Sequence, residues 1–338
     1  MTQLTLVLPF ALPPAEHATD LVRALQAPAL AALLSRTSSR VALPFDDNIR
    51  TTPHEAWLAQ TLDLSADGHP AFAAAAMRGM GLDPGSDSWF IINPAHIQIT
   101  RNHLTMNDLR GLRLTEAEAR PLFDVAKPYF DEIGKTLLYG EAATWFMRAC
   151  DWSDLQTSSP DASIGLNLTD WLPSGPHAVN FRKLQNEVQM LWFEHPVNVE
   201  RESRGLPAIN SFWPWAPSKA SKAAATKLAV SQAPGWLAAM ATSWATPADL
   251  MSGAGGDTIV VAGELSESAI SGDWASWIDS MHQLEKTLFA PALASLLEGR
   301  VNGVRLLLSH RSALTQLTTS RMAQRAFWRR PTLNRLLP

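Results

Sequence analysis

The densest group of side chains able to bind a small molecule lies between residues 182 and 215. Guanidinium and amide groups donate hydrogen bonds in a geometry that suits phosphate or carboxylate. Arg182, Asn186 and Gln189 follow one another at steps of four and three residues, so they share one stripe of a helix. The pattern predicts an anion-binding site formed by eight residues: Arg182, Asn186, Gln189, His195, Asn198, Arg201, Asn210 and Trp213.

The same stretch also has a structural interpretation, which the chemistry alone favours. An amphipathic helix presents a polar stripe to solvent, and Asn and Arg side chains in a loop often bond to nearby backbone groups. On this interpretation the polar residues of 195–215 hold the chain together and bind no ligand. Both interpretations stay open from the residue pattern.

A second polar group lies on and after a predicted strand at 96–100. His96, Gln98 and Thr100 face one side of such a strand, and His103 and Asp108 lie just beyond it. Imidazole and carboxylate groups bind metals, but this spacing fits no familiar metal template, so a solvated face is the favoured interpretation. The secondary candidate site comprises His96, His103, Asp108 and Glu187.

Composition and absent motifs exclude several function classes. Lys and Arg total 28 against 32 Asp and Glu, so no basic excess favours nucleic acid. The single cysteine excludes a disulfide framework and multi-cysteine metal sites. The sequence contains no G-x-G-x-x-G, Walker A, G-x-S-x-G or H-E-x-x-H motif. The longest Ala/Leu run is far shorter than the roughly 20 residues of a membrane span, and we expect a cytoplasmic protein.

Hydrophobic periodicity predicts the elements that must position these residues. Thr52 is a predicted helix N-cap, and Thr115 with Glu118 forms a capping box. Asn93-Pro94 is a predicted turn between two strands. The predicted strands cover 2–10, 88–93, 96–100, 258–262, 304–309 and 312–318, with a hairpin at 136–139 and 144–147, and the predicted helices cover 19–34, 53–64, 115–130, 178–194 and 273–298.

Strand–helix units frame both ends of the chain, which predicts an α/β core sheet interrupted by an inserted α+β segment. We place the discontinuous core at 1–64 and 176–320, the insertion at 65–175 and a basic tail at 321–338. The tail carries five arginines and no acidic residue, beside Phe327 and Trp328. We expect it to pack on its own domain; the alternative is a docking segment for an acidic partner or a membrane surface.

The stretch from His195 to Trp215 also resembles a known family. It reads His195-Pro196-Val197-Asn198-x-x-Arg201-x-x-x-Gly205-Leu206-x-x-x-Asn210-x-x-Trp213-x-Trp215. This is similar to a segment of the archaeal-type cofactor-independent phosphoglycerate mutases, which belong to the alkaline-phosphatase superfamily. Together with 182–190 and 96–108, it looks like the RpfE-type regulatory proteins of proteobacteria. The resemblance implies a bacterial protein with an alkaline-phosphatase-like mixed sheet flanked by helices.

The resemblance also implies which positions would do chemistry. Working mutases of this family hold two divalent metals with Asp and His ligands and use a serine nucleophile. The matching positions here are Pro9 or Phe10, Pro53, Ser266, Ile270 and the pair Ser309-His310, while Glu267, Gly272, Asp273 and His310 are kept. Prolyl and isoleucyl side chains do not bind Mg²⁺, Mn²⁺ or Zn²⁺, so most of the metal centre is missing.

We therefore expect a phosphoglycerate-mutase-like pseudoenzyme with no catalytic residues, no metal and no cofactor. Such a protein would bind a small anionic ligand or a regulatory protein partner. The alternative is an active mutase or phosphohydrolase that uses Mn²⁺ or Mg²⁺ at a relocated site formed by the secondary candidate residues. A third hypothesis gives residues 195–215 a purely structural role.

Overall fold

The computed structural model describes residues 2–43, 45, 50–100, 103–148, 150–219, 227–241 and 256–337. These residues form two compact units. The first unit is discontinuous and comprises residues 1–57, 225–233 and 241–338, whereas the second comprises 58–224 and 234–240. Within the described ranges, no helix has both the length and the apolar character needed to cross a membrane.

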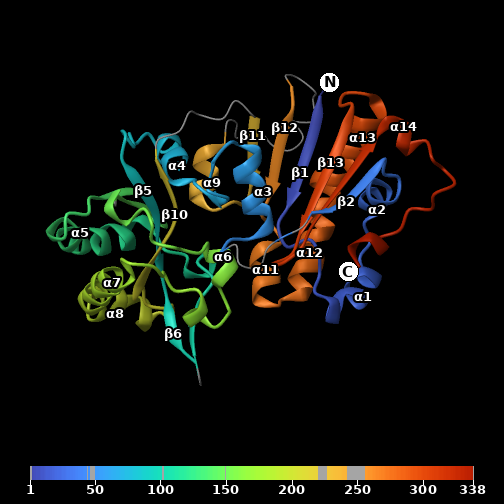
Figure 1. Cartoon of the computed structure of the whole chain (residues 1–338). Helices are drawn as coiled ribbons and strands as arrows, with labels where there is room; N and C mark the ends of the chain where they lie inside the picture. Colours follow the sequence, from blue (N-terminus) through green and yellow to red (C-terminus); the bar gives the residue numbers. More distant parts are fainter. Residues whose placement is uncertain are drawn as a thin grey trace. The chain divides into compact units, whose positions relative to one another are not determined.

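The first unit is built on a six-stranded sheet with the order β11-β12-β1-β13-β14-β2 (Figure 1). β11, β12, β1 and β13 are parallel, so their carboxyl ends meet at one edge, while β14 pairs antiparallel with both β13 and β2. β1 is an almost continuous run of buried residues, as is typical of a parallel strand. The strands are β1 (Gln3–Leu8), β2 (Ser39–Leu43), β11 (Lys227–Ser231), β12 (Thr258–Ala262), β13 (Gly303–Ser309) and β14 (Leu314–Ser320).

A buried carboxylate joins two helices of the first unit. Glu285 accepts hydrogen bonds from the backbone N–H groups of Ala29 (2.6 Å) and Leu30 (3.1 Å) in the first turn of α2. These N–H groups have no partner within their own helix, and a negative charge suits the helix N-terminus. The predicted long helix at 273–298 is present, with a π-helical turn at Glu285–Phe289. The helices are α1 (Ala15–Ala24), α2 (Pro28–Ser35), α11 (Ser266–Ser271), α12 (Trp274–Leu284), α13 (Ala290–Glu298) and α14 (Arg321–Gln324), and α3 (Pro53–Thr61) begins in this unit, which ends at Trp57.

The second unit is built on a four-stranded antiparallel sheet with the order β10-β5-β9-β8. Its core is aromatic: the Trp145 ring lies edge-on to Trp192 and to Phe123, at centroid distances of 6.0 and 5.3 Å. The strands are β3 (Ser65–Ala66), β4 (His69–Pro70), β5 (Ser88–Ala95), β6 (Ile97–Ile99), β7 (Leu104–Met106), β8 (Leu137–Glu141), β9 (Thr144–Arg148) and β10 (Ser211–Lys219). The helices are α4 (Ala73–Gly79), α5 (Glu116–Glu132), α6 (Pro160–Ser163), α7 (Ala178–Phe193), α8 (Pro196–Ser203) and α9 (Gly235–Met240).

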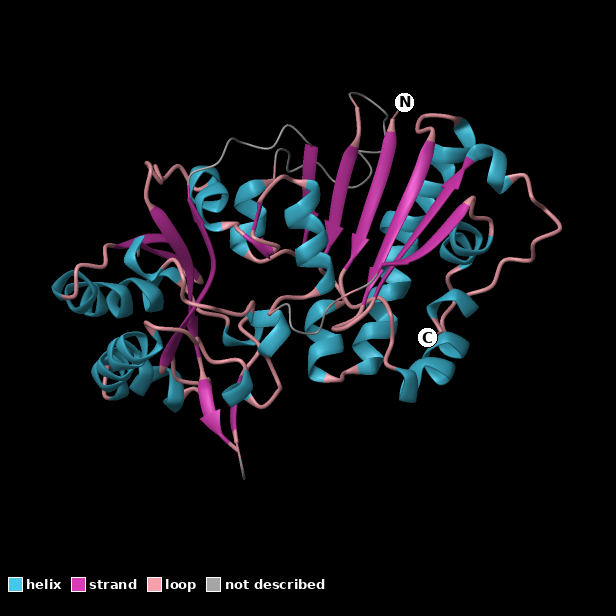
Figure 2. Ribbon diagram, viewed as in Figure 1, coloured by secondary structure: helices cyan, strands magenta, loops and turns pink. Residues whose placement is uncertain are grey.

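The structure confirms the predicted α/β class, with a central mixed sheet flanked by helices (Figure 2). It also confirms the hairpin, as β8 and β9, and the strand predicted at 312–318, which is β14 and pairs with β13. The predicted boundary at residue 176 is wrong, because residues 176–219 belong to the second unit. β10 pairs with β5, and α7 packs on β10, so long-range strand pairing assigns this segment to the other sheet.

The predicted turn at Asn93-Pro94 is also wrong. β5 runs through both residues to Ala95. The pairing of β5 with β9 ends at Ile92, so Pro94 interrupts no hydrogen-bond ladder on that side of the strand. The Asn93 side chain is buried, donates to the backbone carbonyl of Ala143 at 2.7 Å and accepts from the Trp215 indole N–H at 2.7 Å. These bonds hold the segment in the strand.

Candidate functional site

A buried group of polar side chains lies at the carboxyl end of β13 and the start of α3, within the first unit. We call it the strand-end cluster; it consists of Thr51, Thr52, His54, Glu55 and Ser309, and all five are buried. The carboxyl ends of parallel strands are where open α/β sheets bind their ligands. The cluster therefore occupies the position in this fold where a functional site is expected.

The carboxylate of Glu55 organises the start of α3. Its Oε2 accepts hydrogen bonds from the hydroxyls of Thr51 and Thr52, both at 2.7 Å, and from the backbone N–H of Thr52 at 2.9 Å. The Thr52 carbonyl accepts from the N–H of Ala56. Thr52 is therefore the N-cap of α3, as predicted, and Glu55 supplies the reciprocal half of a capping box.

An imidazole connects this helix start to the end of β13. His54 Nε2 lies 3.3 Å from Thr52 Oγ1, and His54 Nδ1 lies 3.2 Å from Ser309 Oγ. Ser309 Oγ also accepts the backbone N–H of Phe10 at 3.3 Å, just after β1. One set of protons satisfies these bonds: Ser309 donates to Nδ1, Nε2–H donates to Thr52, and Thr52 donates to Glu55.

The cluster has the residue types of a nucleophile and its base, because a hydroxyl lies beside an imidazole and a carboxylate. His54 and Glu55 are also ligand types that divalent metals accept. Two ligands do not complete a tetrahedral or octahedral site. Among the described residues of the first unit, no third His, Cys, Asp or Glu has a ligand atom within 4.8 Å of those of His54 and Glu55.

The positions that the family resemblance assigns to metal ligands carry other side chains here. β1 ends at Leu8, so Pro9 and Phe10 stand where the first Asp is expected. The resemblance assigns the final Asp to Ser309, which lies at the end of β13 and makes the internal bonds described above. The kept Asp273 is the N-cap of α12, where hydrogen bonds from the Ser276 hydroxyl and N–H lower its carboxyl pKa. Its observed role is helix capping.

Sequence reasoning placed the nucleophile position near Pro53 and overlooked the hydroxyl one residue earlier. Pro53 is the first residue of α3, and its side chain has no reactive atom. The signal was present as Thr52-x-x-Glu55, a capping-box pattern. The contact between His54 and Ser309 could not be predicted from the sequence, because 255 residues separate them.

In the second unit, Arg201 makes a different kind of network, which we call the arginine latch. The Arg201 side chain is fully buried and donates from Nε to the Pro207 carbonyl at 2.9 Å. Its two terminal nitrogens donate to the Leu112 carbonyl at 2.6 Å and to Glu118 at 2.9 Å. Glu118 also completes the predicted capping box with Thr115 at the start of α5. The latch therefore ties α8 and the following loop to α5.

Three more of the predicted ligand residues bond to the backbone. The Asn198 amide donates to the carbonyls of Trp192 and Ile209 and accepts the Ile209 N–H. The Asn210 amide exchanges two hydrogen bonds, both 2.8 Å, with the backbone of Ile97. Trp213 is fully buried and donates from its indole to the Ser158 carbonyl. These contacts agree with the structural interpretation, in which the polar side chains hold the chain together.

The other four predicted ligand residues are more accessible. Arg182, Asn186 and Gln189 are exposed on α7, where they form the predicted polar stripe. His195 is half-buried and caps α8 by accepting the N–H of Val197, and burial lowers its pKa. The structure thus divides the eight residues into five that are hydrogen-bonded to their own chain and three that form the exposed stripe. Ligand binding by the stripe stays a prediction.

The secondary candidate residues are not gathered into a metal-binding group. The structure describes all four, and no three of their ligand atoms lie within 4.8 Å of one another. His96 Nδ1 lies 2.7 Å from the Ala208 carbonyl. Asp108 pairs with Arg110 at 3.3 Å, and Glu187 pairs with Lys183 at 3.9 Å on the surface of α7. A relocated metal site receives no support from this arrangement.

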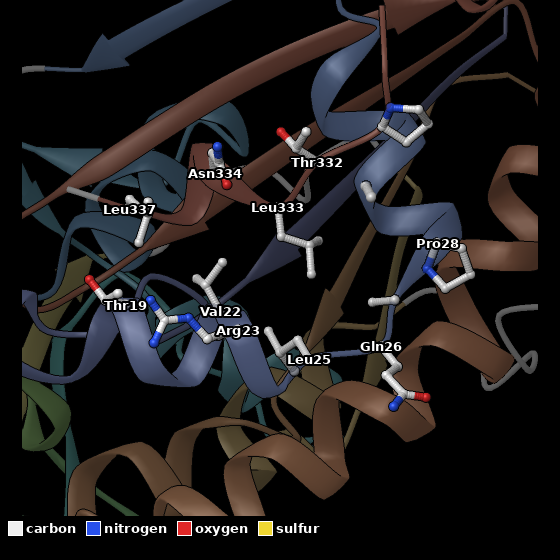
Figure 3. Close-up of a pocket in the computed structure, with 13 residues that line it drawn as sticks. Thr19, Val22, Arg23, Leu25, Gln26, Pro28, Thr332, Leu333, Asn334 and Leu337 are labelled. Carbon is white, nitrogen blue, oxygen red and sulfur yellow. The ribbon is translucent and has the colours of Figure 1, made fainter.

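A pocket of about 530 Å³ lies elsewhere in the first unit, between α1, the start of α2 and residues 331–337 (Figure 3). Val22, Leu25 and Leu333 give it an apolar lining, and Arg23 is the charged residue among those that line it. None of its lining residues belongs to the predicted sites or to the strand-end cluster.

Comparison with known proteins gives a likeness of structure only. No family model and no curated protein matches the chain. The PH0037 protein from Pyrococcus horikoshii aligns with a TM-score of 0.49 and 12% identity, over 94% of this chain and 87% of that one. The cofactor-independent phosphoglycerate mutase from Thermoplasma acidophilum DSM 1728 aligns with a TM-score of 0.42 and 15% identity, over 100% of this chain and 94% of that one. Scores at this level assign no function.

Proposed function

We propose that this chain is a regulatory or ligand-binding protein of phosphoglycerate-mutase-like architecture that has lost two-metal phosphoryl transfer. The observation that carries the proposal is the chemistry at the ends of β1 and β13. A two-metal centre needs several carboxylate and imidazole ligands to clamp the attacking and leaving oxygens. Here the corresponding positions are Pro9, Phe10 and Ser309, and the Ser309 hydroxyl is engaged with His54 and the Phe10 backbone.

The sequence pattern from His195 to Trp215 supports a relationship to the RpfE-type regulatory proteins. Such a protein needs its fold and a binding surface but no metal centre. The arginine latch and the Asn198 bonds explain why the pattern is spaced as it is, because each polar side chain reaches a specific backbone carbonyl. A cytoplasmic location is part of this proposal.

The ligand class follows from the polar stripe on α7. Arg182, Asn186 and Gln189 present one guanidinium and two amides at three- and four-residue spacing, and all three are exposed. This donor set suits a small anion or an acidic segment of a regulatory partner. No cofactor is required for such binding.

Activity measurements test the lost phosphoryl transfer. Purified protein is assayed for 3-phosphoglycerate to 2-phosphoglycerate interconversion with added Mn²⁺ or Mg²⁺, beside a Thr52→Ala variant. We expect equal rates for the two proteins, at the background of the assay. Metal-dependent turnover by the wild type would overturn the proposal. Its loss in Thr52→Ala would point to the Thr52 hydroxyl as the nucleophile, and its persistence would favour the alternative, an enzyme with a relocated site.

Calorimetric titration with 3-phosphoglycerate tests the ligand class. We expect Arg182→Ala to weaken binding about tenfold, because a charge-assisted hydrogen bond is lost. Lys183→Ala is the matched control, since Lys183 is exposed on the same helix but lies off the stripe and pairs with Glu187. Equal effects of the two substitutions, or no binding by the wild type, would contradict an anion site on the stripe.

A further inference from the structure

The segment 321–337 folds back onto the first unit and is held there at several points. Gln324 is buried and donates to the Ala32 carbonyl and to Thr319, and Leu336 is fully buried. The Thr332 N–H donates to Ser35, and Arg329 donates to the Thr37 carbonyl. The expectation that this segment packs on its own domain is therefore confirmed through residue 337.

Between these anchors the segment presents an exposed aromatic pair. Phe327 is 81% exposed and Trp328 is 71% exposed, and their rings contact each other edge-on with centroids 5.3 Å apart. The loop that follows α14 extends outward from the sheet of the first unit (Figure 1). Two large aromatic side chains in water forgo the free energy of burial, and such exposure marks an interaction surface. Neither ring packs into a cleft of its own chain.

Arginines flank this pair in the sequence. Arg325, Arg329 and Arg330 are exposed and flank the two rings in sequence. None of the five arginines of the segment forms an ion pair with an acidic group in the part of the chain that the structure describes. Burial, followed by the charges of Arg40 and Arg329, lowers the pKa of Arg335. Arg335 thus lies within electrostatic range of Arg40 and Arg329.

We propose that Phe327, Trp328 and the arginines beside them dock the protein onto an anionic membrane surface. Aromatic rings favour the headgroup region of a bilayer, and arginine side chains are long enough to reach lipid phosphates while the rings lie deeper. The rings lie on a projecting loop and not in a groove, which suits a flat, deformable surface. The positive charge of the arginines favours anionic lipid. Each arginine near the surface strengthens binding by about 1 kcal/mol, which is about fivefold in the binding constant.

Vesicle sedimentation of the full chain tests this surface. The wild type is mixed with vesicles of phosphatidylcholine alone or of phosphatidylcholine with phosphatidylglycerol. We expect binding to the anionic vesicles only, and release at about 1 M salt, where screening acts within about 3 Å. Equal binding to both vesicle types would overturn the proposal, as would binding to a polyanion such as heparin with none to anionic vesicles.

Two variants identify the side chains responsible. We expect Trp328→Ala to lower the partition coefficient about tenfold, because interfacial burial of the ring is lost. We expect Arg325→Ala with Arg330→Ala to lower it about 25-fold, since each arginine contributes about fivefold. Phe193→Ala is the control, since Phe193 is 72% exposed on α7 of the second unit. Thermal melting verifies that each variant is folded. Unchanged vesicle binding by folded Trp328→Ala would contradict the proposal.

Discussion

Each of the two units buries a polar network, and the two networks differ in their partners. In the second unit, Arg201 donates three hydrogen bonds of 2.6–2.9 Å, two to backbone carbonyls and one to Glu118. In the first unit, His54 bridges Thr52 and Ser309 through contacts of 3.2–3.3 Å, all of them between side chains. The first kind of bond fixes the path of the chain, whereas the second joins groups that can exchange protons.

This difference suits the arginine latch to holding the fold together and the strand-end cluster to chemistry. A guanidinium that is fully buried and bonded to its own fold is not accessible to a ligand, so the Arg201 part of the sequence pattern has a structural role. The less conspicuous Thr52-x-x-Glu55 pattern places a hydroxyl, an imidazole and a carboxylate at the carboxyl ends of parallel strands. Substitutions in the two networks should therefore differ in their effects.

The largest effect is expected for Arg201→Ala. Removing this fully buried side chain leaves two backbone carbonyls without that donor and Glu118 without its buried cation, so we expect a loss of about 3–5 kcal/mol in unfolding free energy. Arg204→Ala is the control, because Arg204 contacts the same Glu118 but is half-exposed, and it should cost less than about 1 kcal/mol. Chemical denaturation measures both. Equal losses would show that the latch does not stabilise the fold.

A smaller loss is expected for Ser309→Ala. This change removes the acceptor of the Phe10 N–H and the partner of His54, and both contacts are long, so we expect a cost of about 1 kcal/mol. The His54 ring resonances in an NMR spectrum should shift, because the hydroxyl at Nδ1 is gone. A loss of unfolding free energy as large as that of Arg201→Ala, with unchanged His54 resonances, would contradict the difference between the two networks.

The smallest effect is a pH dependence of the latch. Burial raises the pKa of Glu118, but hydrogen bonds from Thr115 and the charges of Arg201 and Arg204 outweigh this, so the pKa is lowered from 4.5. Because the folded pKa is below the unfolded value, this stabilisation is present above pH 4.5 and is lost as the pH falls through the folded pKa. Denaturation at acidic pH should show a shallower decline for Glu118→Gln than for the wild type. Identical declines would contradict the assignment.

The sequence predicted what depends on neighbouring residues. The capping box of Thr115 and Glu118, the N-cap at Thr52 and the apolar run of β1 are all local patterns, and all are present. The sequence could not show that Arg201 reaches Glu118, since 83 residues separate them. The same limit explains the misplaced domain boundary, because the assignment of 176–219 depends on the pairing of β10 with β5.

The candidate site shows the same division. The motif that carried the family resemblance was recognised, but whether its polar atoms were available for a ligand depended on backbone carbonyls that the sequence does not place. The exposed state of Phe327 and Trp328 likewise depends on which parts of the segment 321–337 are anchored, which follows from tertiary contacts with residues 32–37.

The number of divalent ions bound by each chain tests the central claim most directly. Purified protein is dialysed against Mn²⁺, and the bound metal is measured by elemental analysis for the wild type and for His54→Ala with Glu55→Gln. The loss of two-metal chemistry predicts fewer than two ions bound by the wild type. Two tightly bound Mn²⁺ ions per chain, both lost in the double variant, would contradict it.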